Sequence, residues 1–398
     1  MPVEALEKLH ADLAANVTAG EVPGLVTAVV RGDDVDVFCA GATAVEGGVP
    51  VRRDTIFRIA SMTKPMAAFA ALRLIDEGRF GLDEPVGRLL PELAAPRVLR
   101  ELGAPVGDTV PVERAIVVRD LLAFTAGFGV VMAGPGTYPI QAEIEAAFGP
   151  PGPPRPAHTL PGDEYLARLG ALPLLHQPGA QWMYNTASDV LGVLMARATG
   201  ASLDEVLREY LFEPLGMPDT GFWVTEGAVG RLAVSYTVGA DGGLELFDPA
   251  RGGQWTAPPP LESAAGGLVS TVDDCLAFTR LMLGRGVVGG RRLLSGELFA
   301  EMTRDQLSPA QKAHTEWVPG FFDTHGWGLG LAVRTVAGDG ESAGSYGWSG
   351  GLGTAWACDP ALGSAGILLT QRAMTSPVPN PVMNAFWSQV PAVTGWVG

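Results

Sequence analysis

The segment FRIASMTK at residues 57–64 opens an alanine-rich stretch, Ser61–Asp76, that is expected to form a helix. A spacing of three residues in a helix places the Lys64 amine one turn above the Ser61 hydroxyl, on the same face. A serine hydroxyl is a poor nucleophile until a nearby base takes its proton, and a lysine can do so when desolvation lowers its pKa. The segment therefore predicts a nucleophilic serine with a lysine beside it at the start of a helix.

An alternative interpretation of the same spacing is an N-cap serine followed by a surface lysine. The chain holds 14 serines and 3 lysines, so the number of Ser-x-x-Lys matches expected by chance from composition alone is roughly 0.1. The flanks argue against a surface lysine, because Ile59 and Ala60 precede the serine and the apolar run Pro65–Phe69 follows the lysine. An unpaired lysine among such neighbours would be costly, which favours a functional role.

Composition sets the broad class of the protein. The 398 residues are 47% apolar and 18% charged, which supplies an ordinary globular core and excludes a disordered chain. The formal net charge is −16, so charge attraction to a nucleic-acid backbone or to an anionic membrane is not expected.

The location of the protein is predicted from what the sequence lacks. The longest uncharged runs, 121–142 and 373–398, are interrupted by prolines, and neither predicts a membrane-spanning helix. The N-terminal residues read as an acidic amphipathic helix without the apolar run of a signal peptide. Cys39, Cys275 and Cys358 are too widely spaced for a disulfide framework or a CxxC metal pattern. We therefore expect a cytoplasmic protein with no metal site and no cofactor.

Strand-like apolar runs lie at both ends of the chain. Leu25–Val30 and Val35–Ala40 flank a turn at residues 32–34 and predict a hairpin. Three further strands, joined by Gly/Asp/Pro turns, are predicted near the C-terminus, at Trp327–Val336, Ser345–Cys358 and Ala365–Gln371. The simplest assembly is one antiparallel sheet built from both ends, which favours an α+β fold over a doubly wound parallel sheet.

The middle of the chain is mainly helical over residues 163–216 and follows a proline-rich loop at 149–162. Within it, Ala187–Thr199 predicts a helix that stops at Gly200, and Ser202 predicts a capping box with Glu205. Further helices are expected at Val272–Leu283 and Val382–Val390. The chain is therefore predicted to have a discontinuous α/β domain of residues 1–105 and 228–398 and a mostly helical domain of residues 106–227.

Two segments match Gly-x-Ser-x-Gly, the nucleophile motif of α/β-hydrolases, and contain Ser342 and Ser349. That mechanism needs an acidic residue and then a histidine after the serine, whereas all five histidines precede Ser342. Both segments also lie between strand-like runs instead of at a strand-to-helix turn. They are expected to be glycine-rich strand ends without an α/β-hydrolase nucleophile.

The segment at 57–64 resembles the nucleophile segment of serine β-lactamases, penicillin-binding proteins and related esterases. More specifically, it resembles the class C β-lactamase-like group, which includes the family VIII carboxylesterases. The resemblance extends over nearly the whole chain and includes Arg119–Gly127, Pro178–Tyr184, Asp189–Gly192, Glu213–Met217 and Gly266–Thr271. It implies the β-lactamase-like fold, in which a central antiparallel sheet is flanked by helices.

The resemblance also implies roles, position by position. Ser61 would be the acylated nucleophile, and Lys64 and Tyr184 would share the general-base and general-acid work. The Lys-Thr-Gly motif of the β-lactamases falls on Trp348-Ser349-Gly350, residues that would bind substrate. The backbone N–H groups of Ser61 and Gly351 would form the oxyanion hole.

The sequence departs from the β-lactamase pattern at three positions. Trp348 replaces a lysine and would supply an apolar wall instead of a cation for a substrate carboxylate. Thr186 stands where β-lactamases have the asparagine of Tyr-x-Asn, and the adjacent Asn185 is expected to replace it in part as a substrate contact. Phe124 stands where the group often has histidine, and the sequence assigns it no consequence.

The departures remove two polar contacts expected for β-lactam recognition but leave the acylation residues in place. The chain is therefore expected to be a serine carboxylesterase that hydrolyses small-molecule esters, short-chain or aromatic, through an acyl-enzyme on Ser61. A β-lactamase, a D-amino-acid peptidase or an acyltransferase on the same scaffold remains an alternative. A non-catalytic binding module of the penicillin-recognition type is a further one. The natural substrate and the oligomeric state are left open.

Overall fold

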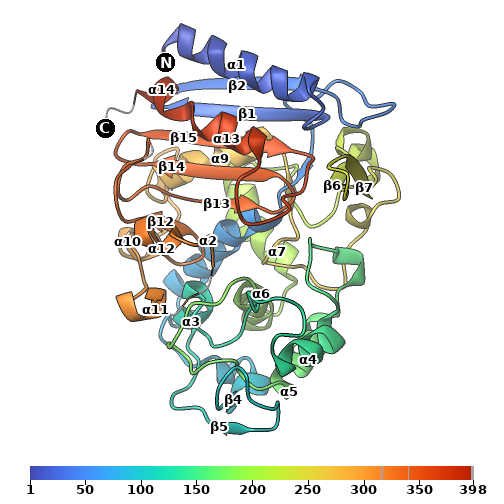
Figure 1. Ribbon diagram of the computed structural model, residues 1–398. Coiled ribbons are helices and arrows are strands. Elements are labelled where there is room, and N and C mark those ends of the chain that lie inside the picture. Colours follow the sequence, from blue (N-terminus) through green and yellow to red (C-terminus); the bar gives the residue numbers. More distant parts are fainter. Residues whose placement is uncertain (314, 316, 339, 396–398) are drawn as a thin grey trace.

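The computed structural model describes residues 1–313, 315, 317–338 and 340–395. Its centre is a seven-stranded sheet, in which the two N-terminal strands lie beside the C-terminal ones (Figure 1). In spatial order, the strands are β11 (His325–Trp327), β12 (Ala332–Arg334), β13 (Tyr346–Gly350), β14 (Thr354–Asp359), β15 (Ser364–Thr370), β1 (Gly24–Arg31) and β2 (Asp34–Gly41). Every neighbouring pair is antiparallel, which confirms the predicted α+β fold.

Helices cover both faces of this sheet (Figure 1). One face packs against α1 (Val3–Thr18), α13 (Pro381–Trp387) and α14 (Val390–Thr394), and the other packs against α9 (Val272–Leu283). The alternation of β1 explains this arrangement, because Leu25 and Val29 join the core under α1, whereas Val26 and Val30 join the larger core that includes α9. The buried run that predicted a strand is therefore a strand with two apolar faces.

The C-terminal strands are more finely divided than predicted. The expected strand Trp327–Val336 is two short strands, β11 and β12, with a loop between them. The expected strand Ser345–Cys358 turns back on itself at residues 351–353, so it forms β13 and β14. At this turn Gly353 has a φ of 97°, and a Cβ there would lie 2.2 Å from the Arg372 carbonyl oxygen. Glycine is needed at this reversal of the chain.

The middle of the chain is mainly helical, as predicted. It contains α3 (Val118–Ala123), α4 (Pro139–Phe148), α5 (Gly162–Ala171), α6 (Thr186–Thr199), α7 (Leu203–Leu207) and α8 (Glu213–Leu215). Gly200 ends α6 in the left-handed conformation, and Ser202 and Glu205 form the predicted capping box. The proline-rich loop holds a short 3₁₀ turn, Pro156–His158. The division into domains at residues 105 and 227 stays a prediction.

The remaining elements are short. The helices are α10 (Gly296–Met302), α11 (Pro309–Ala313) and α12 (Phe321–Thr324). Among the described residues, four two-stranded ribbons pair β3 (Phe57–Arg58) with β8 (Val269–Ser270), β4 (Arg97–Leu99) with β5 (Thr109–Pro111), β6 (Ser235–Val238) with β7 (Leu244–Asp248), and β9 (Val287–Val288) with β10 (Arg291–Arg292). The predicted helix Val382–Val390 is divided between α13 and α14.

The helix that was predicted to begin at Ser61 begins two residues later, as α2 (Thr63–Asp76). It is buried on nearly all sides from Thr63 to Leu72, and so it runs through the core. The strand before it, β3, is anchored by Arg58, which forms a buried ion pair with Asp248 and lies 5.1 Å from the Trp255 ring centre. Along the described residues, none of the helices combines the length and apolar character that crossing a membrane requires.

Candidate active site

Ser61 lies in a single 3₁₀ turn, Ala60–Met62, between β3 and α2. The preceding residue, Ala60, has a φ of 43°, a left-handed conformation that costs free energy for a residue with a side chain. Neighbouring groups hold the turn in place. The Thr63 hydroxyl donates to the Ala60 carbonyl oxygen at 2.6 Å, and the Thr354 hydroxyl donates to that of Ile59 at 2.9 Å. The position of Ser61 is thus set by contacts from α2 and from β14.

Lys64 is buried beside Ser61, with only 1% of its surface exposed. Its Nζ donates to Ser61 Oγ at 2.9 Å, to Asn185 Oδ1 at 2.8 Å, and to the Ala265 carbonyl oxygen. These three acceptors match the three protons of an ammonium group. The alternative interpretation of a surface lysine is therefore wrong.

Burial changes the chemistry of this lysine. Loss of water around the ammonium lowers the pKa of Lys64 to about 7, and the negative charge of Asp189 opposes that fall. A neutral amine keeps two protons for Asn185 and Ala265, so its lone pair faces the Ser61 hydroxyl. In this form Lys64 can accept the proton of the nucleophile near neutral pH.

Tyr184 completes the group around the nucleophile. Its hydroxyl accepts a hydrogen bond from Trp348 Nε1 at 2.7 Å, and its ring centre lies 4.6 Å from Lys64 Nζ. Burial raises the pKa of Tyr184 to about 12, although hydrogen bonds with Ser61 and Trp348 act in the opposite direction. The phenol is therefore protonated at neutral pH, and Lys64 is the group that can be unprotonated there. The ammonium faces the tyrosine ring, where the contact is of the cation–π type.

Asn185 reaches Lys64 through an unusual backbone conformation. It is the N-cap of α6 with φ 83° and ψ −65°, and its side chain accepts from Lys64 instead of capping the helix. Thr186 is the first residue of α6, and its backbone N–H donates to the Tyr184 carbonyl oxygen at 3.3 Å. Asn185 thus contacts the base, whereas its predicted contact with substrate, like that of Thr186, stays a prediction.

The strand β13 brings Trp348, Ser349 and Gly350 to the site. A Cβ at position 350 would lie 2.2 Å from the Ile59 carbonyl oxygen, so glycine allows β13 to pass directly beside the turn of the nucleophile. Ser349 pairs with Ala355 in the β13–β14 ladder. Gly351 follows the strand, and its carbonyl oxygen accepts from the Met374 N–H at 2.8 Å. The assignment of the Gly351 and Ser61 N–H groups to an oxyanion hole stays a prediction.

Aromatic side chains surround Tyr184. Ring centres lie 4.6 Å away for Trp317, 5.5 Å for Trp348, 5.7 Å for Trp182, 5.9 Å for Phe124 and 6.4 Å for Trp327. Phe124 has a φ of 61° at the end of α3 and stacks on Trp327 at 4.8 Å. Phe124 itself is buried, and its role, which the sequence left open, is therefore to pack against the aromatic rings around Tyr184.

Several groups at the site were not found from the sequence. Ala265 contributes a backbone carbonyl, for which no side-chain pattern exists. Asp189 begins a segment that resembled the family, but the resemblance assigned it no role. Trp317 comes from a segment without a motif, and only the fold brings it to Tyr184.

Ser342, the first of the two Gly-x-Ser-x-Gly serines, forms hydrogen bonds through its backbone. The Ser342 N–H donates to Asp359 Oδ2 at 2.9 Å, and the Ser342 carbonyl oxygen accepts from the Ser345 hydroxyl at 2.8 Å.

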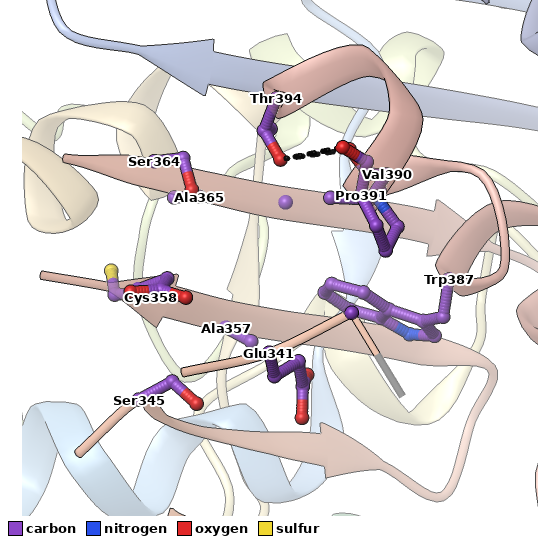
Figure 2. A pocket seen from close by; sticks show the side chains of 13 residues that line it. Glu341, Ser345, Ala357, Cys358, Ser364, Ala365, Trp387, Val390, Pro391 and Thr394 are labelled. Atoms are coloured by element: carbon purple, nitrogen blue, oxygen red, sulfur yellow. Dashed lines mark hydrogen bonds between the residues drawn. The ribbon is translucent and has the colours of Figure 1, made fainter. Parts of the chain in front are cut away.

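A depression lined in part by Glu341 and Ser345, shown in Figure 2, lies between the sheet and the helices α13 and α14. The Thr394 hydroxyl in this depression donates to the Val390 carbonyl oxygen at 2.9 Å. The predicted site residues do not line this depression.

Comparisons with known proteins find a matching family model and similar relatives. A family model described as Beta-lactamase matches residues 9–381. Protein Rv1367c of Mycobacterium tuberculosis is 39% identical over 352 residues, which cover 86% of this chain and 84% of that protein. Esterase EstB of Burkholderia gladioli is 31% identical over 368 residues, which cover 86% of this chain and 85% of that protein.

A solved structure shares the fold over nearly the whole length. EstCE1, described as a hydrolase with promiscuous acyltransferase activity, matches with a TM-score of 0.76 over 98% of each chain, at 24% sequence identity. At this level of identity the likeness concerns the fold.

Proposed function

This chain belongs to the β-lactamase family, and we propose that within it the chain is a serine carboxylesterase. It would hydrolyse short-chain or aromatic esters through an acyl-enzyme on Ser61. The observation that carries the proposal is the hydrogen bond between Lys64 Nζ and Ser61 Oγ, in a buried setting that lowers the pKa of the lysine to about 7. The 31% identity with an esterase over most of the chain supports the choice of ester substrates.

In the acylation step, Ser61 Oγ attacks the ester carbonyl carbon while its proton passes to the neutral amine of Lys64. The negative charge that develops on the carbonyl oxygen would be stabilised by the N–H groups of Ser61 and Gly351. The C–O bond to the alcohol then breaks, and the leaving oxygen takes a proton from the Tyr184 hydroxyl. Lys64, now an ammonium, returns a proton to the phenolate of Tyr184, which leaves both groups as they began. Water releases the acid by the same steps in reverse order.

The surroundings of the nucleophile favour apolar substrates. Trp348 stands where β-lactamases carry a lysine, and its indole N–H is occupied by Tyr184. An aromatic wall of this kind offers apolar area and ring faces for an acyl or alcohol group, but no positive charge for a substrate carboxylate. Apolar contacts discriminate weakly between similar groups, so we expect several short or aromatic esters to be hydrolysed.

The proposal is tested with p-nitrophenyl acetate and butyrate in stopped flow, and with a fluorophosphonate probe followed by peptide mapping. We expect a burst of p-nitrophenol equal to the enzyme concentration before slower turnover, and a probe adduct on the peptide that contains Ser61. Acyl transfer to an added alcohol that outpaces hydrolysis would favour an acyltransferase, and nitrocefin turnover that rivals ester turnover would favour a β-lactamase. If the protein reacts with neither the probe nor any ester, the result would favour the non-catalytic binding module.

The pH dependence of the reaction follows from the base. Only the neutral amine of Lys64 accepts the Ser61 proton, so kcat/KM for p-nitrophenyl butyrate is expected to rise as pH increases through about 7 and then to level off. The phenol of Tyr184, with a pKa of about 12, remains protonated over this range. Rates are measured between pH 5.5 and 9.5, with aliquots returned to pH 8 to verify that the enzyme is intact. A rate independent of pH between 6 and 9 would contradict this assignment of the base.

A further inference from the structure

The amine of Lys64 is oriented partly by the backbone segment of residues 263–268, which leads into β8. The carbonyl oxygen of Ala265 is one of the three acceptors around Lys64 Nζ. Downstream in this segment, the Leu268 N–H donates to the Thr63 hydroxyl at 3.2 Å, and its carbonyl oxygen accepts from the Ile59 N–H at 3.0 Å. The segment is thus tied to the nucleophile turn at its downstream end.

Asp189 ties the upstream end. It lies in the first turn of α6, and its Oδ1 accepts from the Ser263 hydroxyl at 2.7 Å and from the Ala265 N–H at 3.0 Å. The Ala265 residue is therefore held from both sides, with its N–H on Asp189 and its carbonyl oxygen on Lys64. A shift of this residue would move one of the two acceptors that direct the lone pair of Lys64 toward Ser61.

Asp189 also supplies the charge that faces the base. Its carboxylate raises the pKa of Lys64 against the larger effect of burial. Burial raises the pKa of Asp189 itself, while the hydrogen bonds from Ser263 and Ala265 and the charge of Lys64 act in the opposite direction. Two phenols of the described residues face this pair from other elements. Tyr184 covers the amine, and Tyr165 of α5 has a pKa raised by burial and further by Asp189, so both are neutral.

We propose that Asp189 is a positioning residue for Lys64, because it fixes the Ala265 peptide and places a negative charge beside the amine. The proposal rests on the proposed function in so far as Lys64 is the base of the reaction. It assigns two separable contributions to one carboxylate, a geometric one through Ala265 and an electrostatic one on Lys64.

The electrostatic contribution is tested by Asp189→Asn. Both hydrogen bonds end on the same oxygen, Oδ1, so an asparagine can keep them while the charge is lost. The chain has only three lysines, so NMR of protein labelled with ¹³C at lysine Cε resolves Lys64 from Lys8 and Lys312. We expect the midpoint of the Lys64 titration to move lower by about 0.5 to 1 pH in the variant. An unchanged midpoint would overturn the electrostatic part of the proposal.

The geometric contribution is tested by Asp189→Ala, which removes both hydrogen bonds. We expect kcat for p-nitrophenyl butyrate at pH 9 to fall by about tenfold or more with KM within threefold, whereas Asp189→Asn stays within threefold of the wild type at this pH. In the asparagine variant, the rising limb of the pH–rate profile moves lower together with the NMR titration. Equal kcat for the alanine variant and the wild type would overturn the geometric part.

A matched control is Asp204→Asn, which removes another buried carboxylate close to the same segment. Asp204 pairs with Arg208, and its N–H donates to Glu262 Oε2 at 2.8 Å, so its described hydrogen bonds involve neither Ala265 nor Lys64. We expect this variant to leave the Lys64 titration unchanged, and an equal shift in it would overturn the proposal. If the alanine variant fails to fold, the asparagine variant still decides the electrostatic part of the proposal. A wild type without ester turnover contradicts the proposed function, yet the Lys64 titration can still be read.

Discussion

Replacing Ser61 by alanine is expected to lower kcat for ester hydrolysis by at least about 10,000-fold and to abolish labelling by the fluorophosphonate probe. The reaction loses the atom that forms the acyl-enzyme, whereas the amine of Lys64 has no covalent step of its own in the proposed mechanism. Folding should be unaffected, because removal of one hydroxyl leaves Lys64 with Asn185 and Ala265 as partners. The measurement is steady-state hydrolysis of p-nitrophenyl butyrate, with a thermal melt of both proteins.

The two serines of the Gly-x-Ser-x-Gly segments, Ser342 and Ser349, are the matched controls for Ser61→Ala. Ser342 serves the backbone of the loop before β13, and Ser349 lies in β13 opposite Ala355. Ser342→Ala is expected to retain full activity. Ser349→Ala removes a predicted substrate contact, so KM can change, but the probe should still label Ser61. Loss of labelling in Ser349→Ala together with normal labelling in Ser61→Ala would show that the nucleophile is misassigned.

Replacing Lys64 by methionine is expected to lower kcat/KM by about 1,000-fold, with the apparent Tm changed by no more than about 5 °C. Methionine fills a similar volume but cannot take the Ser61 proton. The loss of donors for Asn185 and Ala265 is offset because the charged amine no longer has to be desolvated. The measurement pairs initial rates at pH 8.5 with calorimetry, so that a loss of catalysis is distinguished from a loss of folding.

Two further lysine variants serve as controls for the Lys64→Met experiment. Lys8→Met changes an exposed lysine on α1 that pairs with Asp12, and it should retain wild-type activity. Lys64→Arg keeps a positive charge that cannot be removed near neutral pH, so it should be as inactive as the methionine variant. A Lys64→Met enzyme with more than a tenth of the wild-type rate would instead indicate that Tyr184 serves as the base.

Much of the fold could be predicted because it depends on local pattern. The runs Leu25–Val30 and Ala365–Gln371 are mostly apolar and continuously buried because β1 and β15 are central strands covered on both faces. Gly200 and the Ser202–Glu205 pair marked helix ends through backbone chemistry that acts over a few residues. The boundaries within Ser345–Cys358 were missed because β13 itself contains Gly347 and Gly350, so the glycines of the turn at 351–353 did not mark the end of the strand.

The site was predictable where its chemistry is close in sequence. Ser61 and Lys64 are three residues apart, so helical geometry alone indicates that they meet. Tyr184 and Trp348 lie 123 and 287 residues after Ser61, counted from their positions in the chain, and only the resemblance to a family brought them to the same site. The contact between Asn185 and Lys64 follows from a left-handed backbone at the start of α6, which no pattern of residue types indicates.

From the order of its residues alone, this chain could be assigned its two-sided central strands, its helix ends and a serine with a lysine one turn away, since each depends on neighbours within a few positions. The reactivity of Ser61 and Lys64 depends on segments that are distant in the sequence. Lys64 has a pKa near neutrality because distant segments exclude water from it, and its direction is set by Asn185 and by the Ala265 carbonyl. Burial and backbone acceptors are properties of the packed chain, so they exist only once segments far apart in sequence have come together.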